Sequence, residues 1–67
     1  MRIMKLYQFT IVFKGGGVEC ESAFTFKEAA ILACAKRIKD GLHLEISRII
    51  NDDTGDVYEE PTLKLCN

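Results

Sequence analysis

Hydrophobic and polar residues alternate along the first part of the chain. Within Ile3–Lys14, apolar or aromatic residues occupy every second position at Tyr7, Phe9, Ile11 and Phe13. The positions between them include Gln8 and Thr10. This period of two, rich in aromatic and β-branched residues, predicts a strand with one strongly apolar face.

A second strand is predicted to return beside the first. Gly15–Gly17 supplies residues that adopt positive φ, as a tight hairpin turn requires. The return strand runs from Val18 to about Ser22. It places Val18, Cys20 and Ser22 on one face, and Glu19 and Glu21 on the other. We expect Cys20 to lie on the core face, so that the two glutamates face solvent.

The next segment has the pattern of a capped helix. Thr25 and Glu28 form a capping box, with a hydroxyl at the N-cap and a carboxylate three residues later. The helix is predicted to run from Phe26 to about Asp40, and Gly41 is suited to end it in the left-handed conformation. The stripe expected to pack on the sheet is Ile31, Cys34, Ala35 and Ile38, continued by Leu42.

The apolar part of this helix is wider than one sheet face needs. Residues Ala29–Ala35 are apolar without interruption. Either the helix lies flat on a broad sheet, or its second side is covered by a partner or by a second copy of the chain.

Alternation resumes after the helix. Leu42–Ser47 predicts a third strand, and the adjacent residues Ile49 and Ile50 indicate a bulge or the end of that strand. Asn51–Asp56 has the composition of a turn, with Gly55 suited to positive φ.

The chain is predicted to end in one or two further strands. Val57–Glu60 should form a fourth strand. Pro61 has no amide proton to donate, so it either ends that strand or marks an edge of the sheet. Thr62–Cys66 is a candidate for a short fifth. With 67 residues there is room for one domain, over residues 1–67. The order β-β-α-β-β predicts an α+β fold of two layers, in which one helix packs on one face of a mainly antiparallel, four- to five-stranded sheet.

Charge and cysteine content narrow the class of protein. Nine basic and ten acidic residues give a net charge of −1, which argues against a strongly basic nucleic-acid coat or membrane-surface peptide. Three cysteines, at positions 20, 34 and 66, form an odd set without paired spacing. This is typical of reduced thiols in a cytosol rather than of a disulfide scaffold.

The sequence offers little for catalysis or metal binding. His43, the one histidine, is expected on the solvent face of the third strand beside Glu45 and Ser47. A domain with one helix seldom encloses a pocket for such groups. The cysteines and His43 contain no C-x-x-C or H-x-x-x-H unit, and the acidic turn lacks the spacing of a calcium loop. We therefore predict a non-enzyme without cofactor or metal.

The charges are segregated along the chain. The first eighteen residues contain bases and no acid, whereas residues 51–60 contain acids and no base. The ordinary interpretation is that turns favour Asp and that edge strands carry charge. The functional interpretation is an acidic hairpin that docks on a basic protein surface by imitating phosphate charge. Its candidate residues are Asp52, Asp53, Asp56, Glu59 and Glu60, with Glu19 and Glu21 added if the two hairpins lie on the same side.

Two other functions remain open. The spare apolar face of the helix favours a structural or regulatory homodimer. A weak nucleic-acid-binding module would instead use the cations of the helix and third strand together with a sheet aromatic, because bases stack on aromatic side chains. Its residues would be Lys36, Arg37, Lys39 and Arg48, with Tyr7 or Phe9.

The layout also resembles that of known small proteins. Tyr7-x-Phe9 in a first strand, a glycine turn, Thr25-x-x-Glu28-Ala29 opening an alanine-rich helix, and Gly41 before a strand are similar to small phage and prophage proteins, among them small anti-CRISPR proteins. The resemblance spans most of the chain through generic motifs. It implies an inhibitor in the host cytosol that binds stoichiometrically, for example to the basic nucleic-acid channel of a Cas complex. It transfers no site residue.

Overall fold

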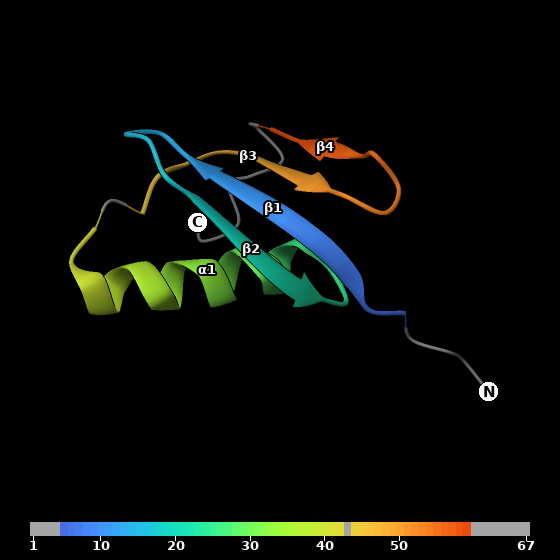
Figure 1. The fold of residues 1–67 in the computed structure, drawn as a ribbon, viewed down its shortest axis with the longest axis horizontal. Coiled ribbons are helices and arrows are strands. Elements are labelled where there is room, and N and C mark those ends of the chain that lie inside the picture. The colour runs from blue at the N-terminus through green and yellow to red at the C-terminus, as the bar shows by residue number, and fades with distance from the viewer. Residues whose placement is uncertain (1–4, 43, 60–67) are drawn as a thin grey trace.

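One helix and four strands make up the described part of the chain. The computed structural model describes residues 5–42 and 44–59. In chain order the elements are β1 (Tyr7–Phe13), β2 (Val18–Ala23), α1 (Phe26–Asp40), β3 (Ile46–Asn51) and β4 (Val57–Tyr58). The strands form one sheet with α1 across one of its faces (Figure 1), which confirms the predicted two-layer α+β fold.

β1 lies in the middle of the sheet. The strand order is β2-β1-β3-β4, and all neighbouring strands are antiparallel. The β1–β2 turn contains Gly16 at φ 91° and Gly17 at φ 112°, which confirms the predicted glycine turn. Residues with a side chain rarely adopt these angles, so the glycines set this hairpin.

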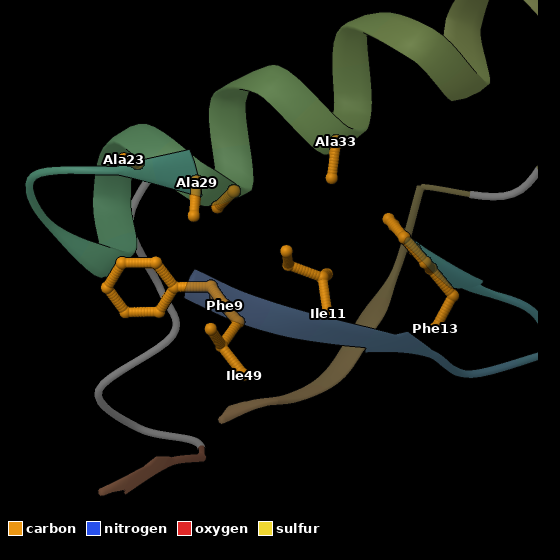
Figure 2. Packing of buried hydrophobic residues seen from close by; sticks show 8 residues of the cluster. Phe9, Ile11, Phe13, Ala23, Ala29, Ala33 and Ile49 are labelled. Atoms are coloured by element: carbon orange, nitrogen blue, oxygen red, sulfur yellow. The ribbon is translucent and has the colours of Figure 1, made fainter. Parts of the chain in front are cut away.

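The core lies between β1 and α1. Its largest buried side chains are Phe9, Ile11 and Phe13 from β1, and Ile49 from β3. Small residues complete the core, namely Ala29, Ala30 and Ala33 from α1 and Ala23 from β2 (Figure 2). Alanines allow the helix to approach the sheet closely, and each large buried side chain contributes about 1.5–3 kcal/mol of burial free energy.

Both ends of α1 form as predicted. The Thr25 hydroxyl accepts a hydrogen bond from the Glu28 amide at 3.2 Å, and the Glu28 carboxylate accepts one from the Phe24 amide at 2.9 Å. Gly41 has φ 70°, and its amide donates to the carbonyl of Ile38. The capping box and the left-handed terminator are therefore confirmed.

The buried face of α1 differs from the prediction. Ala29, Ala30, Ala33 and Arg37 face the sheet. Ile31 and Ile38 from the predicted stripe are 66% and 63% exposed. The apolar run is wide enough to allow either face, and the bulky aromatic side chains of β1 leave room for alanines rather than isoleucines.

The facing of β2 is also opposite to the prediction. Glu19, Glu21 and Ala23 point toward α1, whereas Val18 and Cys20 lie on the outer, exposed face. Cys20 is therefore an exposed thiol, and Cys34 is half-buried with its sulfur 4.0 Å from the carbonyl oxygen of Leu44. The register pairs Ala23 with Tyr7, which places the odd-numbered residues of both strands on the core side.

Several strand limits differ from those predicted. β1 begins at Tyr7, and β3 begins at Ile46 rather than Leu42 and continues through the two isoleucines. The irregularity lies instead where β1 at Val12 and Phe13 pairs with β3. β4 is formed by Val57 and Tyr58. Glu60, Pro61 and the predicted fifth strand at Thr62–Cys66 lie outside the described residues.

β4 is joined to the helix by an aromatic pair. The rings of Tyr58 and Phe26 stack at 4.2 Å between centroids, with 12° between their planes. This contact brings the start of α1 next to the last described strand. Within residues 5–42 and 44–59, no helix has the length and apolar character needed to cross a membrane.

Candidate functional site

The acidic turn between β3 and β4 is an ordered, hydrogen-bonded loop. The buried side chain of Asn51 accepts hydrogen bonds from the amides of Asp53 at 2.9 Å and Thr54 at 3.1 Å. Its main chain bonds to Gly55 and Asp56. Gly55 has φ 83°, as the turn composition predicts. These bonds fix the path of the backbone that carries the aspartates.

Two of the aspartates also tie the loop to β1. The Thr10 hydroxyl donates a hydrogen bond to Asp52 Oδ2 at 2.8 Å, and the backbone amide of Gln8 donates one to Asp53 Oδ2 at 2.9 Å. The Asp52 amide donates in turn to the Gln8 carbonyl at 2.8 Å. Asp52 and Asp53 therefore hold the loop against the central strand as well as carrying charge.

The remaining carboxylates of this region are exposed as well. Asp56 accepts a hydrogen bond from the Thr54 hydroxyl at 3.1 Å, and Glu59 follows β4 on the surface. Asp52, Asp53, Asp56 and Glu59 form what we call the acidic loop. Among the residues that the structure describes, no cation forms an ion pair with any of the four. Their negative charge therefore acts outward, and the potential of several like charges on one loop attracts basic partners.

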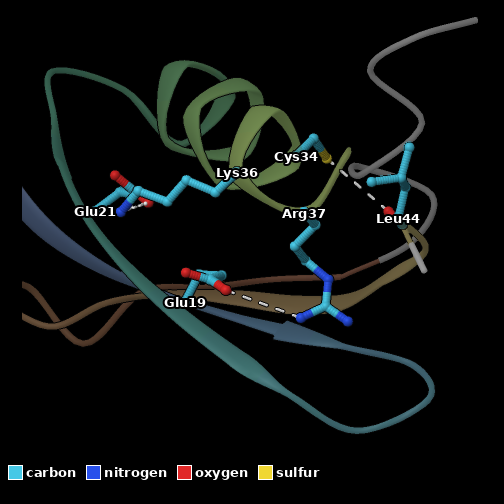
Figure 3. A network of polar contacts seen from close by, with 6 residues as sticks. All are labelled: Glu19, Glu21, Cys34, Lys36, Arg37 and Leu44. Carbon is cyan, nitrogen blue, oxygen red and sulfur yellow. Dashed lines mark hydrogen bonds and ion pairs between the residues drawn. The ribbon is translucent and has the colours of Figure 1, made fainter. Parts of the chain in front are cut away.

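Glu19 and Glu21 do not belong to this surface. Both point to α1 and are paired within the fold (Figure 3). Lys36 Nζ lies 2.7 Å from Glu21 Oε2, and the Glu21 side chain is 9% exposed. Arg37 Nη1 lies 3.9 Å from Glu19 Oε2. The hydrogen bond to Glu21 raises the pKa of Lys36 above its usual 10.5, helped by the charge of Glu19.

Arg37 lies at the centre of this second charged region. Arg37 is 5% exposed, and its guanidinium carbon lies 4.0 Å from the centroid of the Phe13 ring. The guanidinium also fills the space beside Gly17, where an added Cβ would lie 2.7 Å from Nη1. Arg37 therefore packs the hairpin turn on the helix by cation–π and charge contacts.

The structure does not assemble the nucleic-acid face considered from the sequence. Phe9 is buried, Tyr7 is half-buried against the core, and Arg37 is buried. Lys36 is engaged by Glu21. Arg48 lies on the outer face of the sheet, where it pairs in register with Val12. The candidate bases and aromatics thus do not form one exposed surface.

Candidate catalytic and metal-binding residues are not brought together. His43 and Glu60 lie outside the described residues, Glu45 is exposed and Ser47 is half-buried. In the described part of the chain, no group of three His, Cys, Asp or Glu side chains is arranged to hold a metal ion.

The residues that anchor the acidic loop are not indicated by the sequence pattern. The alternation marks Gln8 and Thr10 only as the polar side of the first strand. Their role follows only from knowing which strand pairs with β1, because the pairing of β1 with β3 brings Thr10 opposite Ile50 and close to the loop.

Comparisons with models of protein families, with curated proteins and with solved structures found no match.

Proposed function

We propose that this chain is a small non-enzymatic binding protein that docks its acidic loop on a basic surface of another protein. The observation that carries the proposal is the set of exposed carboxylates on an internally bonded loop, free of ion pairs to the cations of the described residues. Because no cation of the described residues pairs with these carboxylates, their charge is available to attract a basic partner.

The hydrogen bonds of the loop favour tight docking. Association costs free energy for every segment that must be ordered, and a loop held in one conformation has less of this cost. The bonds from Gln8 and Thr10 fix the two aspartates relative to the sheet. Exposed charge of one sign also accelerates encounter with an opposite surface, in a manner that salt suppresses.

A nucleic-acid-binding surface is the target class that suits this loop best. Such surfaces are built to receive rows of phosphates, and a row of carboxylates presents the same sign of charge. The resemblance to small anti-CRISPR proteins puts forward the basic channel of a Cas complex, reached in the host cytosol. The chain would then act by occupying the channel, so that nucleic acid cannot enter.

The test compares matched charge reversals in a direct binding measurement. The purified chain is measured against Cas effector complexes by biolayer interferometry, with competition by their nucleic-acid substrate. Glu59→Lys should weaken binding by about tenfold, or about 1.4 kcal/mol. Glu45→Lys reverses another exposed acid, away from the loop, and should leave binding within about twofold.

A second variant removes the charge of the three aspartates while keeping the hydrogen bonds of the loop. The triple change Asp52→Asn, Asp53→Asn and Asp56→Asn retains an oxygen acceptor at each position for Thr10, Gln8 and Thr54. It should weaken binding and reduce its salt dependence, because Glu59 is the one described carboxylate of the loop that keeps its charge. If the triple variant binds as tightly as the wild type, the acidic loop is not the docking surface. If no Cas complex binds the wild type, a pull-down of basic nucleic-acid-binding proteins tests the broader proposal.

A further inference from the structure

Within the described residues, the face of α1 that points away from the sheet carries exposed apolar side chains. Ile31 and Ile38 are 66% and 63% exposed, and Ala35 between them is exposed too. Their spacing of four and three residues aligns them along one side of the helix. We call these three residues the outer stripe; Leu42, which is 49% exposed, follows beyond Gly41, where the helix has ended. A continuous exposed apolar patch of this kind marks an interaction surface.

We propose that the outer stripe is the interface of a twofold dimer, in which α1 packs antiparallel on α1 of a second copy. The stripe is complementary to itself. Ile31 and Ile38 lie on either side of its midpoint, so the twofold operation places each isoleucine against the other one of the second copy. Ala35 beside the midpoint lets the two helix axes approach closely.

The charges beside the stripe support this orientation. Glu28 and Lys39 are exposed and lie eleven residues apart, about three helical turns, on the same flank of the stripe. Antiparallel pairing brings equal flanks of the two helices together. Glu28 of each copy then lies near Lys39 of the other, which gives two ion pairs related by the symmetry axis.

The sheet edges are less suitable for a dimer. β2 is an edge of the sheet, and it points Glu19 and Glu21 inward to Arg37 and Lys36. A strand added beside β2 would pack next to these paired charges, which is a known protection of edges. β4, at the other edge, consists of two residues. A second copy therefore gains most by covering the outer stripe.

The first experiment measures the mass of the full chain in solution. Sedimentation velocity from about 10 μM to 1 mM should show a concentration-dependent dimer. Ile38→Glu should shift this equilibrium to monomer by about a hundredfold, because each copy then buries a charge against Ile31 of the other. Val18→Glu introduces the same charge at a residue that is 56% exposed on the outer sheet face and should leave the dimer intact.

Each other result of this experiment overturns the proposal. A monomeric wild type at 1 mM does so directly, and a dimer lost in Val18→Glu but kept in Ile38→Glu assigns the interface to the sheet. A monomer whose Tm falls with Ile38→Glu means that the stripe is covered within its own chain. None of these variants alters the acidic loop, so failure here is separate from failure of the proposed function.

The second experiment tests the antiparallel orientation by mixing two charge variants. Lys39→Glu places acids together across the axis, and Glu28→Lys places bases together, so each homodimer should weaken. An equimolar mixture restores both ion pairs and should form the heterodimer about tenfold more tightly than either homodimer. Circular dichroism checks that Glu28→Lys, which removes a helix cap, is still folded. If mixing gives no recovery between folded variants, the orientation is wrong.

Discussion

The molecule carries two regions rich in carboxylates that differ in how their charge is balanced. On β2, Glu19 and Glu21 turn toward α1 and meet Arg37 and Lys36. On the acidic loop, the carboxylates turn outward and bond to hydroxyls and amides. A carboxylate whose charge is balanced inside the fold contributes to stability, whereas one left to solvent is available to a partner. The face on which an acid lies thus decides its role.

Removing Arg37, the buried cation that pairs with β2, should have the largest effect on stability. Arg37→Ala deletes the guanidinium that covers Phe13 and leaves Glu19 without its cation. We expect a loss of about 3–5 kcal/mol in the free energy of unfolding, measured by urea denaturation. Arg48→Ala, at an exposed cation, should cost about 0.5 kcal/mol or less. Equal losses in the two variants would contradict the assignment of Arg37 as a core residue.

Substitutions of the two hairpin glycines test how closely Arg37 packs on the β1–β2 turn. Gly17→Ala combines positive φ with a Cβ that would lie 2.7 Å from Arg37 Nη1, so the guanidinium must move. It should cost about 2–3 kcal/mol in thermal or chemical denaturation. Gly16→Ala also has positive φ but meets no atom within 4 Å, and should cost about 1 kcal/mol. A double variant with Arg37→Ala should remove the difference between the two glycines.

The anchors of the acidic loop should have a smaller effect. Asp53→Ala removes the acceptor of the Gln8 amide and should lower the free energy of unfolding by about 1 kcal/mol. Asp53→Asn keeps an oxygen in place and should recover most of that loss. Amide hydrogen exchange at Gln8 reports the bond directly. Slow exchange that persists in Asp53→Ala would show that this contact does not order the loop.

The smallest expected effect is a pH dependence of the free energy of unfolding that comes from the Lys36–Glu21 pair. The folded-state pKa of Lys36 is raised by its bond to Glu21. The contribution of Lys36 to the free energy of unfolding is therefore complete below its pKa in the unfolded state, about 10.5. It is lost as pH rises through its higher pKa in the folded state. The stability difference between wild type and Lys36→Gln should shrink above about pH 10.5, in urea titrations at stepped pH. A difference that stays constant to pH 12 would contradict the pairing.

The sequence predicts the elements of this fold well because local chemistry determines them. The Thr25–Glu28 capping box, Gly41 and the glycine hairpin each act through hydrogen bonds or φ values within a few residues. The helix limits follow from these residues alone. The acidic loop is likewise predicted as a turn from Asn51–Asp56, because Asn51 and Gly55 supply the local bonds and angles that a turn requires.

The facing of the elements depends on contacts between distant residues and was predicted less well. A helix with apolar residues on every side can bury Ala33 or Ile31, and the aromatic side chains of β1 decide between them. β2 offers Val18 and Cys20 on one face and two glutamates on the other, so burial of the acids requires knowledge of Lys36 and Arg37 on the helix. No periodicity contains that information.

The central position of β1 has a consequence for how the chain folds during synthesis. β1 is made before β2 and α1, yet one of its two neighbours is β3, which follows only after the helix. While the ribosome adds the intervening residues, the hairpin and helix can form, but the side of β1 that β3 will cover stays open. Pairing at such long sequence separation is slow, and an open strand edge favours aggregation. Chaperone contact with the nascent hairpin is therefore expected until Asn51 has left the exit tunnel.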